Sequence, residues 1–359
     1  MHFVHIISSL DKINYGVWNP VLSTFNTYIK TGHDCVLLTP RLSTESLAVI
    51  DKRLHSYIYK NKPEKMVNYV SNQFAIDSTI IITHGNWTAV TRVGAKLKSL
   101  GFKWVVYPHG MLEPWAFRHK YVKKVIYYNL FEKRYLNKTD LIVAVGKPEF
   151  DNLKGKFATK MVHIPNGTRI PDIHQKKVYD DKIVFLFMAR LHHKKGILPL
   201  VKGWLKSNLA RKTRFQLLVA GPDEGEEAKI RRLLNQKDNI QILGPVYNEK
   251  KKVVLNQAHY YILPSYSEGF PTSIVEAMAH GCIPIISKGC NFPEAFEKDL
   301  AFMVSPDANI ICDRLNTIVQ TSSELFYEKS EAGYNFVKEN YSIESIVEQQ
   351  LTHYKSIMK

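Results

Sequence analysis

Short apolar runs alternate with amphipathic stretches through the first half of the chain. The runs predict buried strands, which we place at Phe3–Ile7, Cys35–Leu38, Ser56–Tyr59, Thr79–Thr83, Trp104–Tyr107, Leu141–Val145 and Val162–Ile164. Between them, apolar residues at helical spacing predict helices over Val17–Lys30, Thr88–Leu100 and Ala116–Leu136. This order of elements is typical of a doubly wound α/β sheet, in which ligands bind beyond the carboxyl ends of the strands.

The second half repeats this alternation after a polar break. Pro165, Asn166, Gly167 and Pro171 interrupt the chain between His163 and Lys182. Strands are predicted at Ile183–Met188, Phe215–Ala220, Ile240–Leu243, Tyr260–Leu263 and Ile283–Ser287, and helices over Glu224–Asn235 and Asn248–Gln257. A chain of 359 residues fits two domains. We expect them over residues 1–170 and 171–340, followed by a terminal helix over 341–359 with Ser342 as its N-cap.

The stretch SYSEGFPTSIVEAMAHGCIP, which follows the strand Tyr260–Leu263, carries the clearest chemical signal. A polar turn leads into a helix that Pro271 opens and Gly281 closes. Unpaired amides and the positive end of the helix dipole attract anions at such a turn. Glu268 and Glu276 flank the turn, and carboxylates accept hydrogen bonds from hydroxyl groups. A phosphate with sugars on both sides, as in a nucleotide sugar, satisfies both features.

The spacing of these two glutamates in EGFPTSIVE resembles the E-x7-E motif of retaining GT-B glycosyltransferases. The likeness is to the bacterial "group 1" enzymes of family four. It implies two Rossmann-like doubly wound α/β domains that face a central cleft, with the last helix crossing back onto the N-terminal domain. In that family the first glutamate contacts the donor sugar and the second contacts the nucleotide ribose. The turn, here Gly269, Phe270, Pro271 and Thr272, lies against the donor. Without the surrounding motif, two solvated acids at a helix N-terminus would be an equal alternative.

The segment ARLHHKKG, directly after the strand Ile183–Met188, is similar to the family's segment that contacts the donor diphosphate. Arg190, Lys195 and Gly196 are retained, whereas Ala189 stands where glycine is usual. Two cations at the end of a strand would neutralise the charge that develops on a departing nucleoside diphosphate. The alternative, a basic surface loop, is disfavoured because Arg190 follows a buried strand so closely.

Three further positions are assigned to the donor side from the resemblance. Gly221 in LLVAGPDEG is expected to admit the base or the ribose, and Val246 in ILGPVYNEKK to meet the base. The loop after the first strand, SSLDKINYG, often carries a glycine-rich turn in the family, and here only Gly16 remains. Asn14, Tyr15 and Gly16 therefore either line the cleft or belong to an ordinary loop.

Two His-Gly pairs follow neighbouring strands of the first half, in THGNW and YPHGMLEPW. Glycine after each histidine permits close approach by a ligand. The second segment resembles the one whose histidine faces the donor sugar and the reaction centre, a role that we transfer to His109. We place His84 on the acceptor side. Glu113 is either an acceptor-side base or a loop acid, and we favour the loop acid.

Charge is distributed unevenly along the chain. Residues 1–173 hold 24 Lys and Arg against 12 Asp and Glu, and the remainder holds 25 against 21. The predicted helix from Ala116 to Leu136 mixes basic and aromatic residues, namely Arg118, Lys120, Lys123, Lys124, Phe117, Tyr121, Tyr127 and Tyr128. Such a helix fits contact with an anionic membrane surface. A core-packed helix with a solvated basic side is the slightly favoured alternative, and the two can coexist.

The cysteines, the apolar runs and the first residues indicate where the protein is located and which classes of protein it does not resemble. The four cysteines lack metal-type spacing and lie in or beside apolar sequence, which favours reduced thiols in a cytoplasmic protein. No apolar run has the length of a membrane span, and the first residues do not resemble a signal peptide. No nucleic-acid-binding signature accompanies the positive charge. We expect a cytoplasmic location, with peripheral contact at the inner face of the membrane.

The function implied by the resemblance is retaining transfer of a hexose-type sugar to an acceptor hydroxyl on a glycan or lipid-linked glycan. Cell-surface polysaccharide or lipopolysaccharide assembly is the family's commonest setting. We expect no cofactor and no metal, since cations replace the missing D-x-D pair, and we favour UDP over GDP as the carrier. The alternatives are a GT-B epimerase and a non-catalytic GT-B relative that acts as a binding partner. A third alternative, a Rossmann dehydrogenase, requires G-x-G-x-x-G after the first strand, and the SSLDKINYG loop lacks it.

Overall fold

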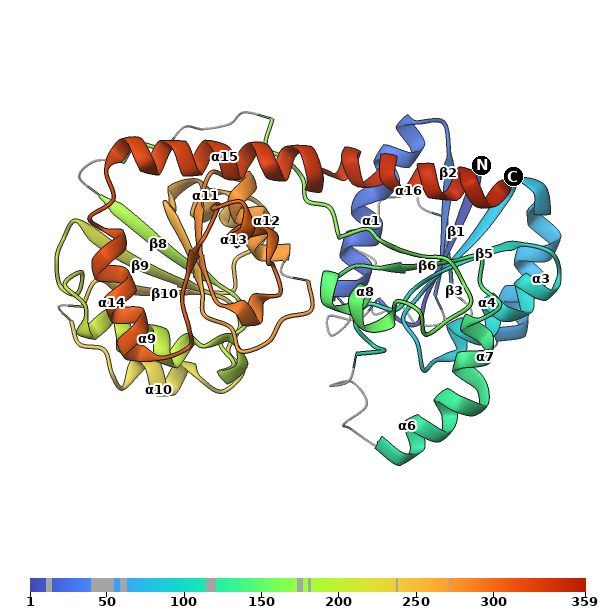
Figure 1. The fold of residues 1–359 in the computed structure, drawn as a ribbon, viewed down its shortest axis with the longest axis horizontal. Coiled ribbons are helices and arrows are strands. Elements are labelled where there is room, and N and C mark those ends of the chain that lie inside the picture. The colour runs from blue at the N-terminus through green and yellow to red at the C-terminus, as the bar shows by residue number, and fades with distance from the viewer. Residues whose placement is uncertain are drawn as a thin grey trace. The chain divides into compact units, whose positions relative to one another are not determined.

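The computed structural model describes residues 1–10, 15–39, 55–58, 63–113, 121–172, 177–179, 182–236, 238–270 and 272–359. The chain divides into two compact units (Figure 1). The first unit comprises Met1–Gly167 and Ile343–Lys359, and the second comprises Thr168–Ser342. The chain therefore changes unit close to the predicted boundaries at residues 170 and 340. Each unit is built on its own parallel sheet.

In the first unit, strands alternate with helices along the chain. The described strands are β1 (His2–Ile7), β2 (Asp34–Thr39), β3 (His55–Ile58), β4 (Thr79–His84), β5 (Lys103–Tyr107), β6 (Leu141–Ala144) and β7 (Met161–His163). The helices are α1 (Tyr15–Lys30), α3 (Pro63–Gln73), α4 (Ala89–Ser99), α6 (Tyr121–Tyr127), α7 (Lys133–Leu136), α8 (Lys147–Leu153) and α16 (Ile343–Met358). The described part of this unit also contains a 3₁₀ turn at Ile76–Ser78 and a π-helical turn at Tyr128–Glu132.

Helices cover both faces of this sheet, whose order is β3-β2-β1-β4-β5-β6-β7. Side chains of a strand point alternately to opposite faces. Phe3 accordingly packs in the core beneath α1 and α16, while Val4 packs in the core beneath α3 and α4. Burial on both faces explains why the strands appear as continuous apolar runs in the sequence.

The second unit has the same plan. Its strands are β8 (Ile183–Met188), β9 (Phe215–Ala220), β10 (Ile240–Gly244), β11 (Tyr260–Leu263), β12 (Ile283–Ile286) and β13 (Phe302–Met303), in the order β10-β9-β8-β11-β12-β13. Its helices are α9 (Ile197–Lys206), α10 (Glu227–Arg231), α11 (Asn248–Gln257), α12 (Thr272–Ala279), α13 (Glu294–Glu297), α14 (Ala308–Ile318) and α15 (Ser323–Tyr341), with 3₁₀ turns at His193–Lys195 and Lys288–Cys290.

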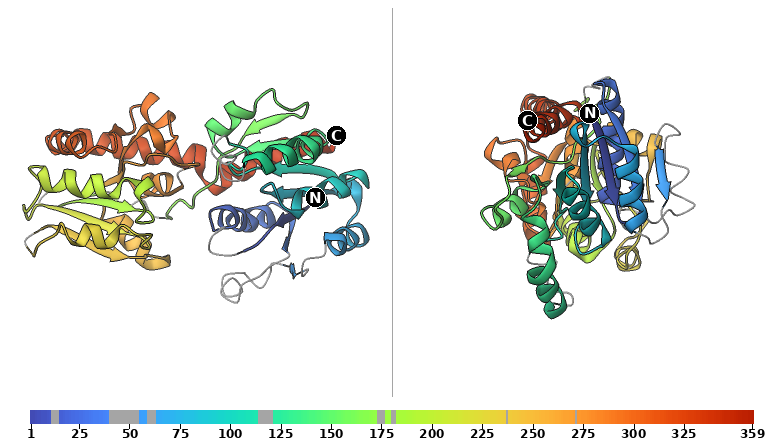
Figure 2. Two further views of the ribbon diagram at one scale, coloured as in Figure 1. Left: turned by 90° about the horizontal axis from the view of Figure 1, so that it is seen from below. Right: turned by 90° about the vertical axis from the view of Figure 1, so that its right-hand side faces the viewer.

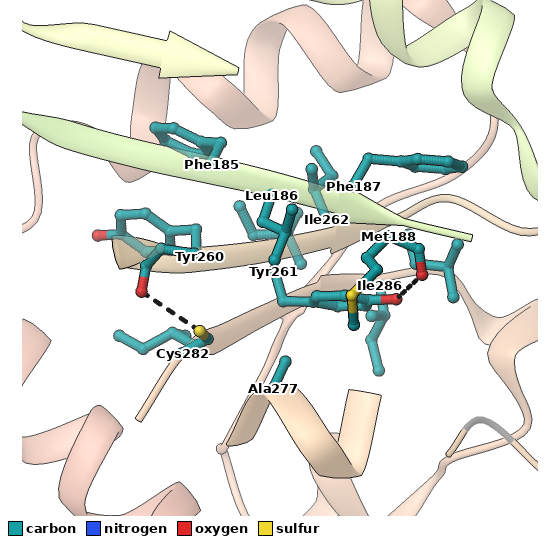
Figure 3. Close-up of a cluster of buried hydrophobic side chains, with 14 of the residues drawn as sticks. Phe185, Leu186, Phe187, Met188, Tyr260, Tyr261, Ile262, Ala277, Cys282 and Ile286 are labelled. Carbon is teal, nitrogen blue, oxygen red and sulfur yellow. Dashed lines mark hydrogen bonds between the residues drawn. The ribbon is translucent and has the colours of Figure 1, made fainter. Parts of the chain in front are cut away.

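Aromatic residues fill the centre of the second core. Phe185 of β8 and Tyr260 of β11 stack at 4.8 Å between ring centroids, and both are fully buried (Figure 3). Tyr261, on the opposite face of β11, extends beneath β8 and donates a hydrogen bond to the Met188 carbonyl oxygen (2.8 Å). This core fixes the ends of β8 and β11 relative to each other.

The C-terminal helix α16 belongs to the first unit, where it packs on α1 (Figure 1). A buried polar network attaches it there. The Tyr28 hydroxyl of α1 donates to the Gln350 side-chain oxygen, and Gln350 Nε2 donates to the Tyr107 hydroxyl (3.0 Å). The Tyr107 and Tyr354 hydroxyls are also hydrogen-bonded to each other (2.8 Å). Ser342, the predicted N-cap, lies in extended conformation between α15 and α16.

All twelve predicted strands are confirmed, each within one residue of an observed end. Two predicted helices were wrong in extent. The helix predicted over Glu224–Asn235 is only Glu227–Arg231. It begins late because the Asp223 carboxylate accepts hydrogen bonds from the backbone of Gly225, Glu226 and Glu227 and holds them in a turn. After Arg231 the backbone forms i→i−3 turn bonds, from Leu233 N to Ile230 O and from Leu234 N to Arg231 O.

The helix predicted over Ala116–Leu136 is described from Tyr121 onward, and it is broken by the π-helical turn. At that turn the buried Glu132 carboxylate points inward and accepts hydrogen bonds from Asn86 (2.8 Å) and Thr91 (2.9 Å). Residues Phe117, Arg118 and Lys120 lie outside the described residues. The cysteines are unpaired, with Cys35, Cys282 and Cys290 buried and Cys312 half-buried.

Candidate active site

The strand order of the second sheet creates an opening between β8 and β11. The chain runs from β8 outward through β9 and β10, then crosses to β11 on the other side of β8. Such a topological switch point is where open α/β sheets bind ligands, beyond the carboxyl ends of the strands. Arg190 and Lys195 follow β8, and Glu268 follows β11. These three predicted donor residues therefore lie at one edge of one sheet.

Lys195 and Glu268 form an ion pair at this edge. Lys195 Nζ lies 2.5 Å from Glu268 Oε2, and the two side chains are 15% and 11% exposed. The other carboxylate oxygen, Glu268 Oε1, is buried and has no hydrogen-bond partner among the described residues. A buried polar atom without a partner costs about 1–3 kcal/mol. Glu268 Oε1 is thus suited to accept a hydrogen bond from a ligand hydroxyl.

The backbone beneath this ion pair is held by close contacts between two loops. The Lys194 carbonyl oxygen accepts hydrogen bonds from Tyr266 N (2.8 Å) and Ser265 Oγ (2.9 Å). Gly196 has φ +69°, and a Cβ atom at this position would lie 2.0 Å from the Pro264 carbonyl oxygen. Glycine is therefore required for the Lys195 loop to reach the end of β11.

Glu276 lies in α12 and forms a second ion pair. Its Oε2 lies 2.6 Å from Lys251 Nζ of α11, and both side chains are about one-third exposed (28% and 31%). Burial raises the pKa of Tyr261 well above its usual value, and the negative charges of Glu268 and Glu276 add to this effect. The Tyr261 hydroxyl is also hydrogen-bonded to Ser273 Oγ (2.8 Å), in the first turn of the helix that carries Glu276.

Arg190 forms a third and more exposed ion pair. Its Nη1 lies 2.9 Å from both carboxylate oxygens of Glu224, which follows β9. The Arg190 side chain is 58% exposed. An exposed pair of this kind contributes little to stability, so the guanidinium can exchange its carboxylate partner for another anion at small cost.

The four predicted residues of the turn differ in their surroundings. Gly269 is exposed, and a Cβ there would meet nothing within 4 Å, so space is open beside the turn. Phe270 stacks on Tyr341 (5.9 Å between centroids), and Thr272 N donates to the Phe270 carbonyl oxygen (3.0 Å), which leaves that amide occupied. Pro271 lies outside the described residues.

Glycine at position 221 is explained by the packing of the backbone. A Cβ atom there would lie 1.9 Å from the Ala189 carbonyl oxygen, and its φ of +146° also favours glycine. Its expected role of admitting the base or ribose is therefore not needed to explain the residue. Val246 is half-buried and packs against the core of the second unit.

In the first unit, the two predicted histidines come together with a third. His84, the last residue of β4, is 3% exposed and lies between His5 and His109. His5 Nδ1 is 3.0 Å from His84 Nε2, and His84 Nδ1 is 3.0 Å from His109 Nε2. Both ring nitrogens of His84 are thus occupied, so its position favours support of His109 over direct contact with an acceptor. Burial lowers the pKa of His109 to about 4.

His109 is held in an unusual backbone conformation. Its φ is +54° and that of Gly110 is +74°, a region that a residue with a side chain rarely adopts. The carboxylate of Glu149 stabilises this turn, because its Oε1 accepts a hydrogen bond from Gly110 N (2.6 Å) and its Oε2 accepts one from Val145 N (3.2 Å). Burial raises the pKa of Glu149 to about 7.

Glu113 and Gly16 have less specific surroundings. Glu113 Oε2 accepts a hydrogen bond from Asn152 Nδ2 (2.8 Å), and burial raises the pKa of Glu113. This contact fits the loop acid. Gly16 lies in the first turn of α1, whereas Asn14 is outside the described residues.

Two family models cover most of the chain. Residues 169–332 match the family "Glycosyl transferases group 1", and residues 16–170 match "Glycosyltransferase Family 4". The chain belongs to the group 1 glycosyltransferases. It is an enzyme of that class with a two-domain GT-B fold.

Named relatives agree with this membership. The phosphatidylinositol N-acetylglucosaminyltransferase gpi3 subunit of Schizosaccharomyces pombe is 27% identical over 189 residues, which are 50% of this chain and 40% of that protein. A phosphatidylinositol N-acetylglucosaminyltransferase subunit from Arabidopsis thaliana is 22% identical over 363 residues, 96% of this chain and 79% of that one. Among solved structures, Anabaena HepE in complex with UDP and glucose aligns with a TM-score of 0.73 at 15% identity, over 99% of this chain and 100% of that chain.

Several residues at the two sites of this glycosyltransferase were missed by sequence reasoning. Lys251 and Glu224 pair with predicted donor residues, and His5 and Glu149 support His109. Glu224 and Lys251 lie within the segments LLVAGPDEG and ILGPVYNEKK, but only Gly221 and Val246 of those segments were assigned to the donor. A histidine within the buried run HFVHII gives a further signal, since a buried imidazole needs a hydrogen-bond partner.

Proposed function

We propose that this glycosyltransferase is retaining and metal-independent, and moves a hexose-type sugar from a nucleoside diphosphate sugar, UDP in preference to GDP, to an acceptor hydroxyl. The observation that carries the proposal is the partly buried Lys195–Glu268 ion pair at the switch point of the second sheet. A phosphate would meet the lysine and a sugar hydroxyl would meet the unpaired oxygen of the glutamate. The ion pair would thus contact both the diphosphate and the sugar of the donor.

The neighbouring residues have roles that follow from their charges. Lys195 and Arg190 would stabilise the negative charge that develops on the departing diphosphate, and no proton transfer is required for that. Glu268 would orient the donor sugar through its hydroxyl groups. Glu276 would accept hydrogen bonds from the ribose hydroxyls while Lys251 remains beside it and balances its charge. His109, at the carboxyl edge of the first sheet, would face the sugar and the acceptor.

We propose a glycan or a lipid-linked glycan as the acceptor, in cell-surface polysaccharide or lipopolysaccharide assembly. Two relatives are named as phosphatidylinositol N-acetylglucosaminyltransferases, which supports a lipid-linked acceptor and a hexose-type sugar. The positively charged first half of the chain suits an acceptor that carries phosphate.

The surface of α6 and of the π-helical turn that follows it supports a peripheral location on an anionic membrane at the cytoplasmic face. Val122, Ile126, Leu130 and Phe131 are exposed, and Lys123 is exposed beside them. In Figure 2 (right) and Figure 1, α6 extends away from the sheet of its unit. Apolar residues flanked by cations on a helix favour the boundary between headgroups and acyl chains. Among the described helices, none is both long and apolar enough to cross a bilayer.

A donor panel tests the proposed function. UDP-, GDP-, ADP- and TDP-glucose are each added to the protein, and thermal stability and turnover are measured with and without an acceptor glycan. We expect one base to stabilise the protein, and turnover to depend on the acceptor. Turnover into a second nucleotide sugar without acceptor would indicate an epimerase instead.

Two further readouts test the finer statements. The anomeric configuration of the product, measured by proton NMR, should equal that of the donor. Activity should persist after dialysis against EDTA, and loss that added Mg²⁺ or Mn²⁺ restores would contradict metal independence.

A further inference from the structure

A groove of about 750 Å³ opens on the second unit. Its walls come from the 3₁₀ turn His193–Lys195, from α9, α10 and the start of α14, and from the loop after β11. Because α9 packs against both α10 and α14, the groove is built entirely within one unit. Its volume lies in the range of small-molecule sites, roughly 300–1,000 Å³.

The groove adjoins the candidate donor site but differs from it. Lys194 and Ser267 line the groove, and they are the sequence neighbours of Lys195 and Glu268. Among the described residues that we assign to the donor, none lines the groove. A ligand in the groove would therefore lie beside the donor without occupying its place.

An aromatic ring on the wall of the groove is held in a fixed position. Tyr266 is 55% exposed. Its backbone N–H donates to the Lys194 carbonyl oxygen (2.8 Å), and its hydroxyl donates to the Pro306 carbonyl oxygen (3.2 Å). Gly289 packs so closely behind it that a Cβ there would lie 2.6 Å from the Tyr266 carbonyl oxygen. The partly negative face of a fixed aromatic ring attracts the C–H groups of a sugar ring.

The groove also carries positive charge that the protein does not neutralise. Its two acids are already engaged: Glu226 Oε1 lies 2.7 Å from Lys229 Nζ, and Asp307 accepts hydrogen bonds from two backbone amides at the start of α14. Lys194 and Lys202 are exposed, and neither has an acidic partner in the part of the chain that the structure describes. Two ammonium groups thus remain for an anionic ligand.

We propose that this groove binds a sugar that carries an acidic group, either a carboxylate or a phosphate. The sugar ring packs on Tyr266, and the acidic group lies beside Lys194 and Lys202. A neutral sugar would use only the aromatic ring, and a free anion would use only the lysines. The source of the sugar rests on the proposed function: it is an acidic unit of the acceptor glycan, separate from the unit that receives the donor sugar.

NMR titration of the protein without nucleotide tests the chemistry of the ligand. The probes are tetragalacturonate, glucose 6-phosphate, neutral maltotetraose and inorganic phosphate. We expect at least one acidic saccharide to shift the amide signals of Lys202 and Tyr266, with a Kd several-fold lower than those of maltotetraose and inorganic phosphate. The saccharide that binds more tightly identifies the acidic group. Equal affinity for maltotetraose or for inorganic phosphate, or no binding of either acidic saccharide, would overturn the proposal.

Substitutions on the two walls test the location. Lys202→Met and Tyr266→Ala should each weaken binding of the acidic saccharide about fivefold, whereas Tyr266→Phe, which keeps the ring, should retain it. Lys206→Met is the matched control, because Lys206 is also in α9 but donates to Asn309 outside the groove (2.8 Å). Wild-type Kd values in folded Lys202→Met and Tyr266→Ala variants would contradict this location.

Competition with nucleotide separates the groove from the donor site. UDP and GDP are each added at saturating concentration, and we expect the acidic saccharide to remain bound. Its displacement by either nucleotide would place it in the donor site and overturn the proposal. Sugar transfer by a protein that binds no acidic saccharide would contradict the groove alone. Saccharide binding by a protein that transfers no sugar from any donor would instead contradict the proposed function.

Discussion

At the scale of single residues, close contacts explain why particular positions accept little variation. Gly196 combines a left-handed backbone with a carbonyl oxygen where its Cβ would be. Gly155 has a similar φ of +78° but nothing within 4 Å of its Cβ position. A side chain at either position would therefore strain the backbone, but only a side chain at position 196 would also clash with a neighbouring atom.

We predict that Gly196→Ala destabilises the protein more than Gly155→Ala. The shared backbone strain costs about 1–2 kcal/mol, and only Gly196→Ala must also displace Pro264 from Lys195 and its loop. Urea unfolding of both variants measures the difference, and donor affinity should fall in Gly196→Ala alone. Equal effects of the two substitutions would show that close approach to Pro264 is unimportant.

A second prediction concerns Glu149. In Glu149→Gln, the amide nitrogen must replace one of the carboxylate oxygens that accept from Gly110 N and Val145 N. One buried N–H then loses its acceptor, at about 1–3 kcal/mol. We expect the His109 turn to relax and kcat to fall more than stability alone explains. Steady-state kinetics well below the melting temperature measure this, with Asp151→Asn on the exposed side of α8 as the control. Unchanged kcat would show that His109 is positioned without Glu149.

At the scale of elements, a polar network fastens α16 to the first unit. The Gln350 side chain joins Tyr28 of α1 to Tyr107 of β5. We predict that Gln350→Leu destabilises the protein by about 2–4 kcal/mol, because two buried hydroxyl groups lose a partner. The neighbouring Gln349→Leu, whose 3.4 Å contact with Ser345 is only half-buried, should change stability far less. Similar unfolding free energies for the two variants would contradict this account.

Element-scale prediction from sequence succeeded for strands and failed for some helix ends. The central strands of each sheet are buried on both faces, so they are continuous apolar runs that stand out from their surroundings. The two-residue edge strand β13 (Phe302–Met303) is less buried and was not predicted. The helix ends at Glu227 and at the π-helical turn depend on Asp223 and on Glu132. Those carboxylates act through contacts with turns and with distant residues, which local apolar spacing does not reveal.

Sequence alone could place those residues of the candidate site whose position follows from the strand directly before them. Lys195 and Glu268 follow buried strands, so each could be placed at a strand end before their contact was known. Lys251, Glu224 and His5 could not, because their partners lie 25, 34 and 79 residues away in the chain. The buried position of His84 was missed for the same reason.

At the scale of the whole molecule, buried imidazoles set the response to acid. Burial lowers the pKa of His5, His84, His109 and His280. Such groups bind protons mainly when the protein unfolds. Their contribution to the free energy of unfolding is therefore fully present above about pH 6.5 and is lost as the pH falls toward 4. Glu149, whose pKa is raised to about 7, acts in the opposite direction, stabilising below its unfolded pKa and less as the pH rises through 7.

Burial also raises the pKa of Glu113 and Glu132. We predict that the buried imidazoles outweigh these carboxyl groups and Glu149. The free energy of unfolding should fall between pH 6.5 and 5, by roughly 1 kcal/mol per pH unit for each uncompensated imidazole. Urea titrations at pH 7, 6 and 5 measure this. A free energy of unfolding that stays constant or rises from pH 7 to pH 5 would contradict the burial of neutral histidines.

The central claim is that the Lys195–Glu268 ion pair holds the nucleoside diphosphate sugar. Lys98 and Asp140 form a comparable ion pair in the first unit, with 2.6 Å between Nζ and Oδ1 and with side chains 28% and 16% exposed. Lys98→Met therefore controls for the loss of a partly buried cation.

The most direct measurement is calorimetric titration of the preferred nucleotide sugar into wild-type protein, Lys195→Met and Lys98→Met. We predict that Lys98→Met binds with the wild-type Kd, whereas Lys195→Met binds about 100-fold more weakly. A folded Lys195→Met variant with the wild-type Kd would contradict the account.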